Sequence, residues 1–478
     1  MATQTGTSAP NGWTGQNGQA FNPDHQSERD FRTYIIDQPE EGLFSIDRAL
    51  FRDPELFELE MHYIFEGTWI YLAHESQLPQ PNDFFTTTMG RQPVILMRNQ
   101  AGDIGGFINT CPHRGATVCL AKRGNQKILT CPYHGWSFNT NGSLVSVKDH
   151  ASGAYPASFE GLDHGLARLP RLANYRGFVF GSLNPEVPDL EEHLGETCNV
   201  IDMLADQAPE GFEVLKGSAD YTFAGNWKLQ AENGVDGYHF DIVHRSFMGV
   251  IQRRTTAQQD TVQALDVQHL AAASQANGGY DLGSGHTLLW IDHPNPQTRP
   301  TYDRRTDIAK RFGETRTRWM MDRVRNLLVY PNVFLMDQIS TQIRVIHPLS
   351  VDKTRVSTYC IAPRGESLTA REHRLRQYED FFNASGVGTP DDLAAFEACQ
   401  RGYTGRQVRW QQGYVRGVER TRRGADAEAQ AVGLHPYSST DDFRDETVFH
   451  GQYRHWLKLM SQGQHAAQGN GQGDRHGA

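Results

Sequence analysis

Two short segments that contain cysteine and histidine constrain the fold of this chain more than any other feature. Cys-Pro-His begins at Cys111 and Cys-Pro-Tyr-His begins at Cys131, and seventeen residues separate the two segments. Each segment offers one thiolate and one imidazole. A [2Fe–2S] cluster with two cysteines on one iron and two histidines on the other needs this ligand set. The sequence therefore predicts a redox centre between two loops, with the ligands Cys111, His113, Cys131 and His134.

A structural zinc site is the alternative, because zinc also binds two cysteines with two histidines. Zinc fingers usually keep the cysteines in one segment and the histidines in the other, whereas each segment here mixes the two. Pro112, Gly115, Pro132 and Gly135 predict tight turns whose backbone N–H groups point at cluster sulfurs. We therefore favour an iron–sulfur cluster of the Rieske type over zinc.

These segments resemble the Rieske loops of bacterial aromatic-ring-hydroxylating oxygenases. In respiratory Rieske proteins each loop carries a further cysteine and the pair forms a disulfide, but the matching positions here are Ala116 and Tyr133. Cys119 has no evident partner, and we expect an ordinary buried thiol there. The resemblance implies a cluster of lower potential that is reduced by a soluble reductase.

Length and charge limit the possible functions. A chain of 478 residues exceeds the size at which single cores stop growing, so two domains are expected. The net charge of −10 and the lack of a lysine or arginine block exclude nucleic acid and anionic membranes as expected partners. Neither a secretory signal nor an apolar stretch long enough to span a bilayer is evident, so we expect a cytoplasmic protein.

The chain is expected to divide into four parts. The polar composition of residues 1–29 predicts a flexible arm. The Gly/Gln-rich composition of residues 461–478 predicts a disordered tail. Residues 45–188 predict a small β domain around the cluster, with a leading helix between Ile46 and Leu72 that starts at Asp53-Pro54. Residues 189–460 form the second predicted domain, with helices at 190–204, 368–382 and 445–460.

A second motif, Asp-x₂-His-x₄-His, places Asp236, His239 and His244 close together in sequence. On a helix, Asp236 and His239 share a face, whereas the two histidines are about 140° apart. We therefore predict that the helix ends near Phe240 or forms a π-bulge there. Two imidazoles and one carboxylate leave open positions on non-haem Fe(II), which would accept the electrons of the cluster.

Further downstream, alternating residues predict two adjacent antiparallel strands at 341–349 and 354–362. Met336 is interpreted as a core residue that could also line a cavity. Thr389 is predicted to cap a helix that Pro390 begins. The neighbouring Asp391 and Asp392 would then complement the helix dipole.

With both motifs, the chain resembles the catalytic α subunit of Rieske non-haem iron ring-hydroxylating dioxygenases, over about residues 46–460. The stretches NWKLQAENGVDGYH, YPNVFLMDQ and HGQYRHWLKLM are most similar to the benzoate, toluate, halobenzoate and anthranilate group. The resemblance implies an α+β fold, with a small all-β Rieske domain and a catalytic domain on a curved antiparallel sheet flanked by helices. It also implies that His239, His244 and Asp392, rather than Asp391, bind Fe(II).

The resemblance further implies that Asp236 bridges a cluster histidine of one subunit and an iron histidine of another. The expected cofactors are one Rieske [2Fe–2S] cluster and one mononuclear Fe(II) per chain, with NADH acting through a separate reductase. The expected partners are a small β subunit and other α subunits, as α₃β₃. Both atoms of O₂ would add to benzoate, anthranilate or a 2-halobenzoate, giving a cis-dihydrodiol, or catechol after loss of the ortho substituent and CO₂.

Two other functions stay open at this stage. A Rieske monooxygenase or O-demethylase would use the same metal centres on another aromatic compound. A Rieske electron carrier would have no catalytic iron, although the long chain after the cluster argues against it. A benzoate-like substrate is an anion and should meet a cation or a helix N-terminus, but the sequence does not identify that group.

Overall fold

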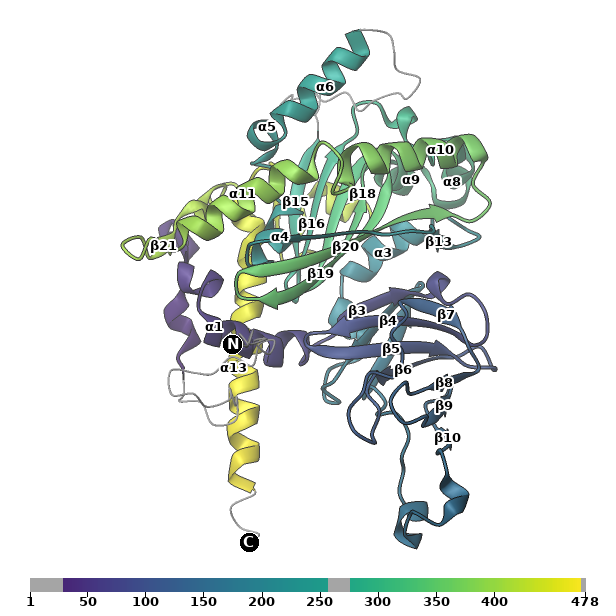
Figure 1. Cartoon of the computed structure of the whole chain (residues 1–478). Coiled ribbons are helices and arrows are strands. Elements are labelled where there is room, and N and C mark those ends of the chain that lie inside the picture. The colour runs from purple at the N-terminus through teal and green to yellow at the C-terminus, as the bar shows by residue number, and fades with distance from the viewer. Residues whose placement is uncertain (1–28, 257–275, 474–478) are drawn as a thin grey trace, which may run out of the picture.

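The computed structural model describes residues 29–256 and 276–473. They form a smaller part built from short strands and a larger part built on an extended antiparallel sheet with helices (Figure 1). This architecture confirms the predicted α+β class and its two kinds of domain. The predicted arm at 1–29 lies outside the described residues except for Arg29, which pairs with Asp53 at 3.3 Å.

Small antiparallel sheets make up the domain that carries the two cysteine–histidine segments. Within the described ranges their strand orders are β6-β5-β4-β7, β11-β12-β3 and β10-β9-β8. The strands are β3 (Ile70–His74), β4 (Asp83–Met89), β5 (Gln92–Arg98), β6 (Ile104–Ile108), β7 (Arg123–Asn125), β8 (Ile128–Thr130), β9 (Ser137–Asn139), β10 (Leu144–Ser146), β11 (Arg171–Tyr175) and β12 (Phe178–Ser182). The first segment follows β6 and the second joins β8 to β9, so both lie at loop tips as predicted.

The large domain is built on one sheet with the order β13-β20-β19-β18-β17-β16-β15-β23-β22, and β14 also pairs with β20. The strands are β13 (Phe212–Val214), β14 (Ala219–Phe223), β15 (Asn277–Gly283), β16 (His286–Asp292), β17 (Arg323–Val329), β18 (Val333–Asp337), β19 (Thr341–Ser350), β20 (Lys353–Pro363), β22 (Arg422–Arg423) and β23 (Ser438–Thr440). The predicted pair at 341–349 and 354–362 is confirmed as β19 and β20, with Gln342 opposite Cys360.

Helices flank this sheet, with α10 and α11 drawn across its upper side in Figure 1. The helices are α1 (Pro54–Glu60), α2 (Leu190–Leu194), α3 (Thr197–Ala205), α4 (Trp227–Asn233), α5 (Phe240–Val243), α6 (Arg245–Thr256), α8 (Arg305–Phe312), α9 (Glu314–Met321), α10 (Leu368–Gln377), α11 (Thr389–Gly402), α12 (Ala427–Gln430) and α13 (His450–Gly473). The predicted helix at 368–382 is confirmed as α10 followed by a π-helical turn (Tyr378–Phe382). The predicted helix at 190–204 is divided because Gly195 has a positive φ of 50°.

The leading segment is less helical than predicted between Ile46 and Leu72. A short 3-10 helix (Arg48–Phe51) precedes continuous helical structure from Pro54 to Phe65, and β2 (Leu43–Asp47) and β3 take up the two ends of the segment. The predicted start is confirmed, since the Asp53 carboxylate accepts the backbone N–H of Glu55 at 2.8 Å. With β1 (Ile35–Gln38) and β21 (Trp410–Gln411), β2 forms a small antiparallel sheet.

This leading segment also packs on the large domain, although we had assigned it to the small one. The fully buried Glu60 of α1 accepts hydrogen bonds from the indole N–H groups of Trp227 and Trp456 at 2.8 and 2.7 Å. The Lys228 ammonium lies 2.5 Å from the same carboxylate. A buried charge needs such partners, so Glu60 joins the segment to α4 and α13.

The predicted disordered tail at 461–478 is wrong for most of its length. We expected the closing helix to end at Met460, but α13 continues to Gly473. Gln464 exchanges hydrogen bonds of 3.1 Å with the backbone N–H and C=O of Arg29, and Gly463 lies directly against the Tyr63 ring. These contacts offset the low helix propensity of the glycines. Composition alone does not show such contacts, and a Gly/Gln-rich composition therefore predicts disorder.

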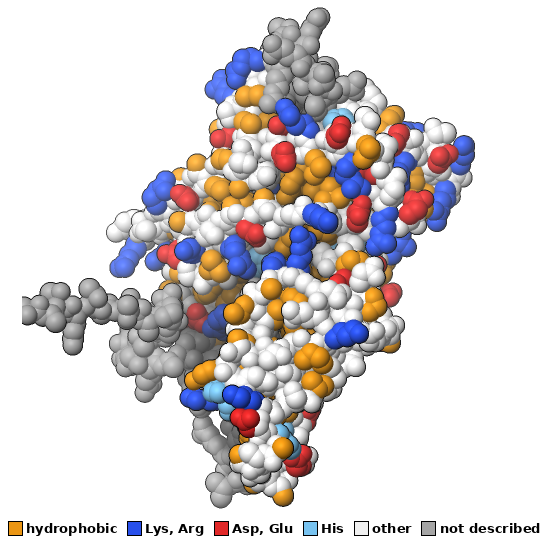
Figure 2. All heavy atoms as spheres, turned by 45° about the vertical axis from the view of Figure 1, so that its right-hand side comes forward, with side chains coloured by type: hydrophobic (Ala, Val, Ile, Leu, Met, Phe, Trp, Pro, Cys, Tyr) orange, Lys and Arg blue, Asp and Glu red, His pale blue; other side chains and the backbone are white. Residues whose placement is uncertain are grey.

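Hydrogen bonds join the two domains directly. The Asn332 side chain accepts from the backbone N–H of Tyr71 and donates to its C=O, at 3.0 and 3.1 Å. Thr88 and His347 share a further hydrogen bond of 3.2 Å. Acidic and basic side chains are interspersed on the face drawn in Figure 2. Among the described residues, no helix has both the length and the apolar character that crossing a membrane requires.

Candidate metal centres

The two cysteine–histidine segments adopt matching turns. The Gly115 N–H donates to the Cys111 carbonyl at 2.9 Å, and the Gly135 N–H donates to the Cys131 carbonyl at 3.1 Å. Both glycines have a φ of 75°, which a residue with a Cβ adopts only at a cost. The glycines predicted to form the turns therefore do so, and they build the same cradle twice.

The four predicted cluster ligands lie together at the end of the small domain. Cys111 and Cys131 are 2% and 3% exposed, and the His113 and His134 rings are 4.5 Å apart between centroids. Burial raises the pKa of the Cys111 thiol, while the backbone N–H of His113 acts in the opposite direction. Backbone donors aimed at a buried sulfur are what a cluster thiolate requires.

The arrangement fits a two-iron cluster better than a single zinc ion. A single metal ion needs ligand atoms that all lie close to one another. Within the described ranges, His239, His244 and Asp392 have ligand atoms that are all within 4.8 Å, whereas the ligand atoms of the cysteine–histidine segments are spread more widely. One tetrahedral ion would draw four ligand atoms together, whereas a cluster separates its cysteine and histidine ends. The donor set and its spacing thus support the prediction made from the sequence.

Two aromatic residues beside the cluster ligands differ in exposure. Tyr133 is 56% exposed and lies against His134, with 3.7 Å between ring centroids. Trp136 is 4% exposed and stacks on His113 at 5.0 Å and 10°. Trp136 is therefore a buried support for a ligand ring, whereas more than half of the Tyr133 side chain is exposed. Cys119 is confirmed as a buried thiol.

The second motif meets a distant aspartate in the large domain. The Nε2 atoms of His239 and His244 are 3.3 Å apart, and an Asp392 carboxylate oxygen lies 3.5 and 3.3 Å from them. Asp391 points elsewhere and accepts a hydrogen bond from the Ser246 hydroxyl at 2.7 Å. Among the two neighbouring aspartates, the structure therefore brings Asp392 to the histidines.

The local structure around the histidines differs from both predicted forms. α4 ends at Asn233, so Asp236 lies in a loop, and the single-turn helix α5 runs between His239 and His244. The backbone break lets both rings face one point without a π-bulge at Phe240. The predicted N-cap at Thr389 is also wrong, because α11 already includes Thr389 and follows Gly388, and the Thr389 hydroxyl donates to the Phe382 carbonyl.

Burial and charge tune the three converging side chains. Burial raises the pKa of the Asp392 carboxyl to about 6, although His239 and Arg344 act to lower it. Burial together with His239 and Arg344 lowers the pKa of His244 to about 3. For His239, burial is outweighed by the Asp236 carboxylate, and the pKa is raised. A neutral His244 offers its lone pair to a metal.

Two further residues orient these groups. Asp236 places a carboxylate oxygen 3.1 Å from His239 Nδ1, on the side of the ring away from Asp392, and its other oxygen accepts the Tyr238 N–H at 2.7 Å. The Asn233 amide donates to Asp392 at 3.3 Å and lies 3.3 Å from His239 Nε2. Sequence reasoning singled out Asp236 but missed Asn233, whose role depends on its distance from Asp392.

The three side chains open into a largely apolar cavity. Its walls come from α5, α6, the strands β16 to β19 and the π-helical turn. The apolar lining includes Phe240, Phe247, Leu289, Ile291, Met336 and Phe381. Asn326, Gln338 and Arg344 are the polar wall residues beyond the metal-binding loop. Such a cavity suits a small aromatic molecule held beside a metal ion.

Comparisons with known proteins agree with this geometry. A family model described as the ring hydroxylating alpha subunit, catalytic domain, matches residues 213–462, and one described as the Rieske [2Fe-2S] domain matches residues 68–170.

The chain is 47% identical to the 2-halobenzoate 1,2-dioxygenase large subunit of Burkholderia cepacia, covering 90% of this chain and 92% of that one. It is 45% identical to toluate 1,2-dioxygenase subunit alpha of Pseudomonas putida, covering 90% and 94%. The crystal structure of naphthalene 1,2-dioxygenase from Rhodococcus sp. bound to indole is similar over 87% of this chain and 94% of that one, with a TM-score of 0.73 and 26% identity.

Proposed function

Because the chain belongs to the Rieske ring-hydroxylating dioxygenase α subunits and is the large subunit of an aromatic-ring 1,2-dioxygenase, we propose that its substrate is a benzoate-type acid. Benzoate, anthranilate and 2-halobenzoates are the candidates. Addition of both oxygen atoms of O₂ to adjacent ring carbons would give a cis-dihydrodiol. Loss of an ortho amino group or halogen together with CO₂ would give catechol.

The observation that carries this proposal is the convergence of His239, His244 and Asp392 at the wall of an apolar cavity. The three side chains would hold one Fe(II) and leave the remaining positions open toward the cavity. Apolar walls such as Phe247 and Met336 would hold the ring by its faces and edges and exclude water. An electron carrier has no need of such a cavity.

Cys111, His113, Cys131 and His134 would hold the Rieske cluster. When both groups are bound, the cluster supplies single electrons and the mononuclear iron activates O₂. The protein contributes geometry and charge: Asn233 would orient Asp392, and Asp236 would fix the tautomer of His239 by accepting its Nδ1 proton.

Asp236 is also the proposed link between subunits. In one chain the cluster segments beside β8 and β9 and the iron ligands beside α5 lie toward opposite ends of the molecule (Figure 1). Asp236 keeps 22% of its side chain exposed, and His134 is partly exposed on the loop between β8 and β9. A neighbouring α subunit could therefore bring its cluster histidine to Asp236, whose carboxylate would join the two rings.

Asp236→Asn tests this role. We expect the variant to bind iron and to keep a reducible cluster, but to lose turnover. Asp241→Asn is a matched control, because Asp241 lies on α5 between the histidines and is not one of the three candidate ligands. Substantial product formation by the Asp236 variant would refute the link.

The proposed assembly has a small β subunit, further α subunits as α₃β₃, and a reductase that takes electrons from NADH. The function itself is tested with benzoate, anthranilate, 2-halobenzoates and neutral aromatic compounds, using ¹⁸O₂ and a matched reductase. Two labelled oxygen atoms in a product from the acids would support the proposal. One labelled atom would indicate a monooxygenase, and conversion of neutral compounds alone would refute the acid as substrate.

A further inference from the structure

A buried arginine lines the cavity beside the iron ligands. Arg344 lies on β19, opposite Phe334 of β18 and Thr358 of β20, in the interior of the sheet. It is 3% exposed, and it belongs to the cavity wall together with Met336 and Phe381. Its positive charge is close enough to affect the pKa of both His244 and Asp392.

Arg344 has no counter-ion among the residues that the structure describes. Its Nε is buried without a hydrogen-bond partner, and its guanidinium forms neither a hydrogen bond nor an ion pair within those ranges. Guanidinium stays protonated in proteins and presents five N–H donors. A buried charge in this state is costly unless something else in the site compensates it.

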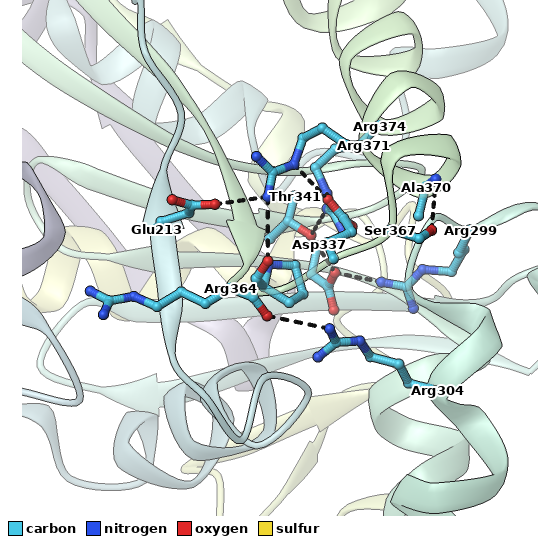
Figure 3. Close-up of polar contacts among 12 residues, drawn as sticks. Glu213, Arg299, Arg304, Asp337, Thr341, Arg364, Ser367, Ala370, Arg371 and Arg374 are labelled. Atoms are coloured by element: carbon cyan, nitrogen blue, oxygen red, sulfur yellow. Dashed lines mark hydrogen bonds and ion pairs between the residues drawn. The ribbon is translucent and has the colours of Figure 1, made fainter.

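Other buried arginines of the large domain show that this chain normally supplies a partner. Figure 3 shows Arg299 directed at Asp337, with Arg374 beside Arg371 on α10. The paired arginines with 4% exposure or less are Arg299 and Arg325 with Asp337, Arg323 with Asp292 and Glu428, and Arg374 with Glu366. In the described structure, Arg344 is the exception, and it is also the one that faces the cavity.

The nearby polar groups do not fill this role. Asp392 directs its carboxylate at His239 and His244 and would be neutralised by bound iron. Gln338 donates its amide N–H to Asn326 at 2.6 Å, and Asn326 donates in turn to the Gly234 carbonyl at 2.8 Å. These amides bind each other and the backbone, which leaves the guanidinium as the free cationic group of the wall.

We propose that Arg344 binds the carboxylate of the substrate, so that an aromatic acid is the missing counter-ion. This inference rests on the proposed function and adds the residue that selects acids over neutral aromatic rings. A guanidinium pairs with a carboxylate through two parallel hydrogen bonds, which would fix the direction of the ring as well as its charge. A ring held in one direction would present a defined pair of carbon atoms to the iron that His239, His244 and Asp392 would hold.

The test uses the complete oxygenase with its reductase and compares wild type with Arg344→Met and Arg344→Lys. Benzoate and benzamide are the matched substrates, since they differ mainly in charge. For Arg344→Met we expect kcat/KM for benzoate to fall roughly 10²–10³-fold, because the acid loses a buried charged partner. The kcat/KM for benzamide should change little in Arg344→Met. Arg344→Lys keeps a positive charge, so its KM for benzoate should lie between those of wild type and Arg344→Met.

A second measurement does not depend on turnover. Benzoate should raise the melting temperature of the wild-type holoenzyme and should raise that of Arg344→Met far less. Without ligand, Arg344→Met should melt at the same temperature as wild type or higher, because an uncompensated buried charge is removed. Arg371→Met is the control: Arg371 pairs with Glu213 and Glu366 outside the cavity, so its loss should leave the KM for benzoate unchanged.

The outcomes separate the two proposals. If wild type converts acids but Arg344→Met keeps the same KM and the same benzoate-dependent melting shift, the role of Arg344 is wrong and the function stands. If Arg344→Met loses iron while iron-loaded molecules still bind benzoate normally, Arg344 serves Asp392 and the inference is again wrong. If wild type binds and converts only neutral compounds, both proposals fail. Should Arg344→Met not fold, an unchanged KM in Arg344→Lys would overturn the inference.

Discussion

The two metal centres are built in opposite ways. The cluster ligands come from two short segments within residues 111–134, and each segment is closed by its own backbone hydrogen bonds. The iron ligands come from the two residues that flank α5 and from Asp392 on α11, more than a hundred residues downstream. The first site depends on local turns, whereas the second depends on the packing of the whole domain.

This difference has a consequence for how each site can fail. A cluster segment is damaged by a change in its own backbone dihedral angles. The iron site is damaged by changes in remote elements that move one ligand relative to the others.

The largest effect is expected from removing a ligand. His239→Ala should lose the mononuclear iron, keep the Rieske absorption and electron spin resonance signals, and reduce turnover to background. Cys111→Ser should lose the cluster and keep the mononuclear iron. Cys119 is a buried thiol nearby, and Cys119→Ser should keep both the cluster and the iron. Iron per chain and the cluster spectrum measure the outcome. Loss of both metals in either ligand variant would show that the two sites are not independent.

Gly237→Ala should perturb the iron site through packing. A Cβ at this position would meet the ring and the carbonyl oxygen of Phe443, so the loop between α4 and α5 would have to move. We expect a loss of about 1–3 kcal/mol in stability, measured by denaturant unfolding, and weaker iron binding. Gly249→Ala within α6 is the control and should be neutral or slightly stabilising. Unchanged iron affinity in the Gly237 variant would contradict the packing argument.

Gly115→Ala should perturb the cluster segment through its backbone alone. None of the residues that the structure describes lies within 4 Å of the position of the new Cβ, but the φ of 75° is strained for alanine. We expect a cost of about 1–2 kcal/mol and faster loss of the cluster, with iron at His239 retained. Gly161→Ala, equally open but without a positive φ, should show no effect. The cluster release rate can be followed by visible absorption.

The smallest effect is the pH dependence of iron binding. Burial raises the pKa of Asp392 to about 6, so in metal-free protein this carboxyl is ionised above that pH and protonated below it. A metal needs the ionised carboxyl and also the neutral ring of His239, whose pKa is raised, so affinity should fall by about tenfold to a hundredfold per pH unit below pH 6. Chelator competition at about pH 5 and about pH 7 measures this. Equal affinities would show that Asp392 is already ionised at the lower pH.

The sequence allowed the local features to be predicted well. The cysteine–histidine segments, their turns and the strand pair β19–β20 depend on neighbouring residues, and the structure agrees with all three. The helix boundaries were less accurate. Gly195 divides one predicted helix, and the contacts of Gln464 with Arg29 extend another beyond Met460.

Long-range features could not be derived from residue patterns. As a dipole-complementing residue, Asp392 was indistinguishable from Asp391, and only the resemblance to a family singled it out. The alternation in β19 predicted a strand around Arg344 but could not show that this arginine lacks a carboxylate when Arg299 and Arg374 have one. Pairing between distant side chains is a property of the folded chain.

The buried carboxylate of Glu60 limits how this protein can be dissected. The Rieske family match begins at residue 68, which suggests a natural place to cut the chain. A truncation there would remove Glu60 and leave the indole N–H groups of Trp227 and Trp456 and the Lys228 ammonium without an acceptor. Trp227 and Lys228 begin the helix that leads into the iron-binding loop, so a segment without any metal ligand is a structural prerequisite for the catalytic centre.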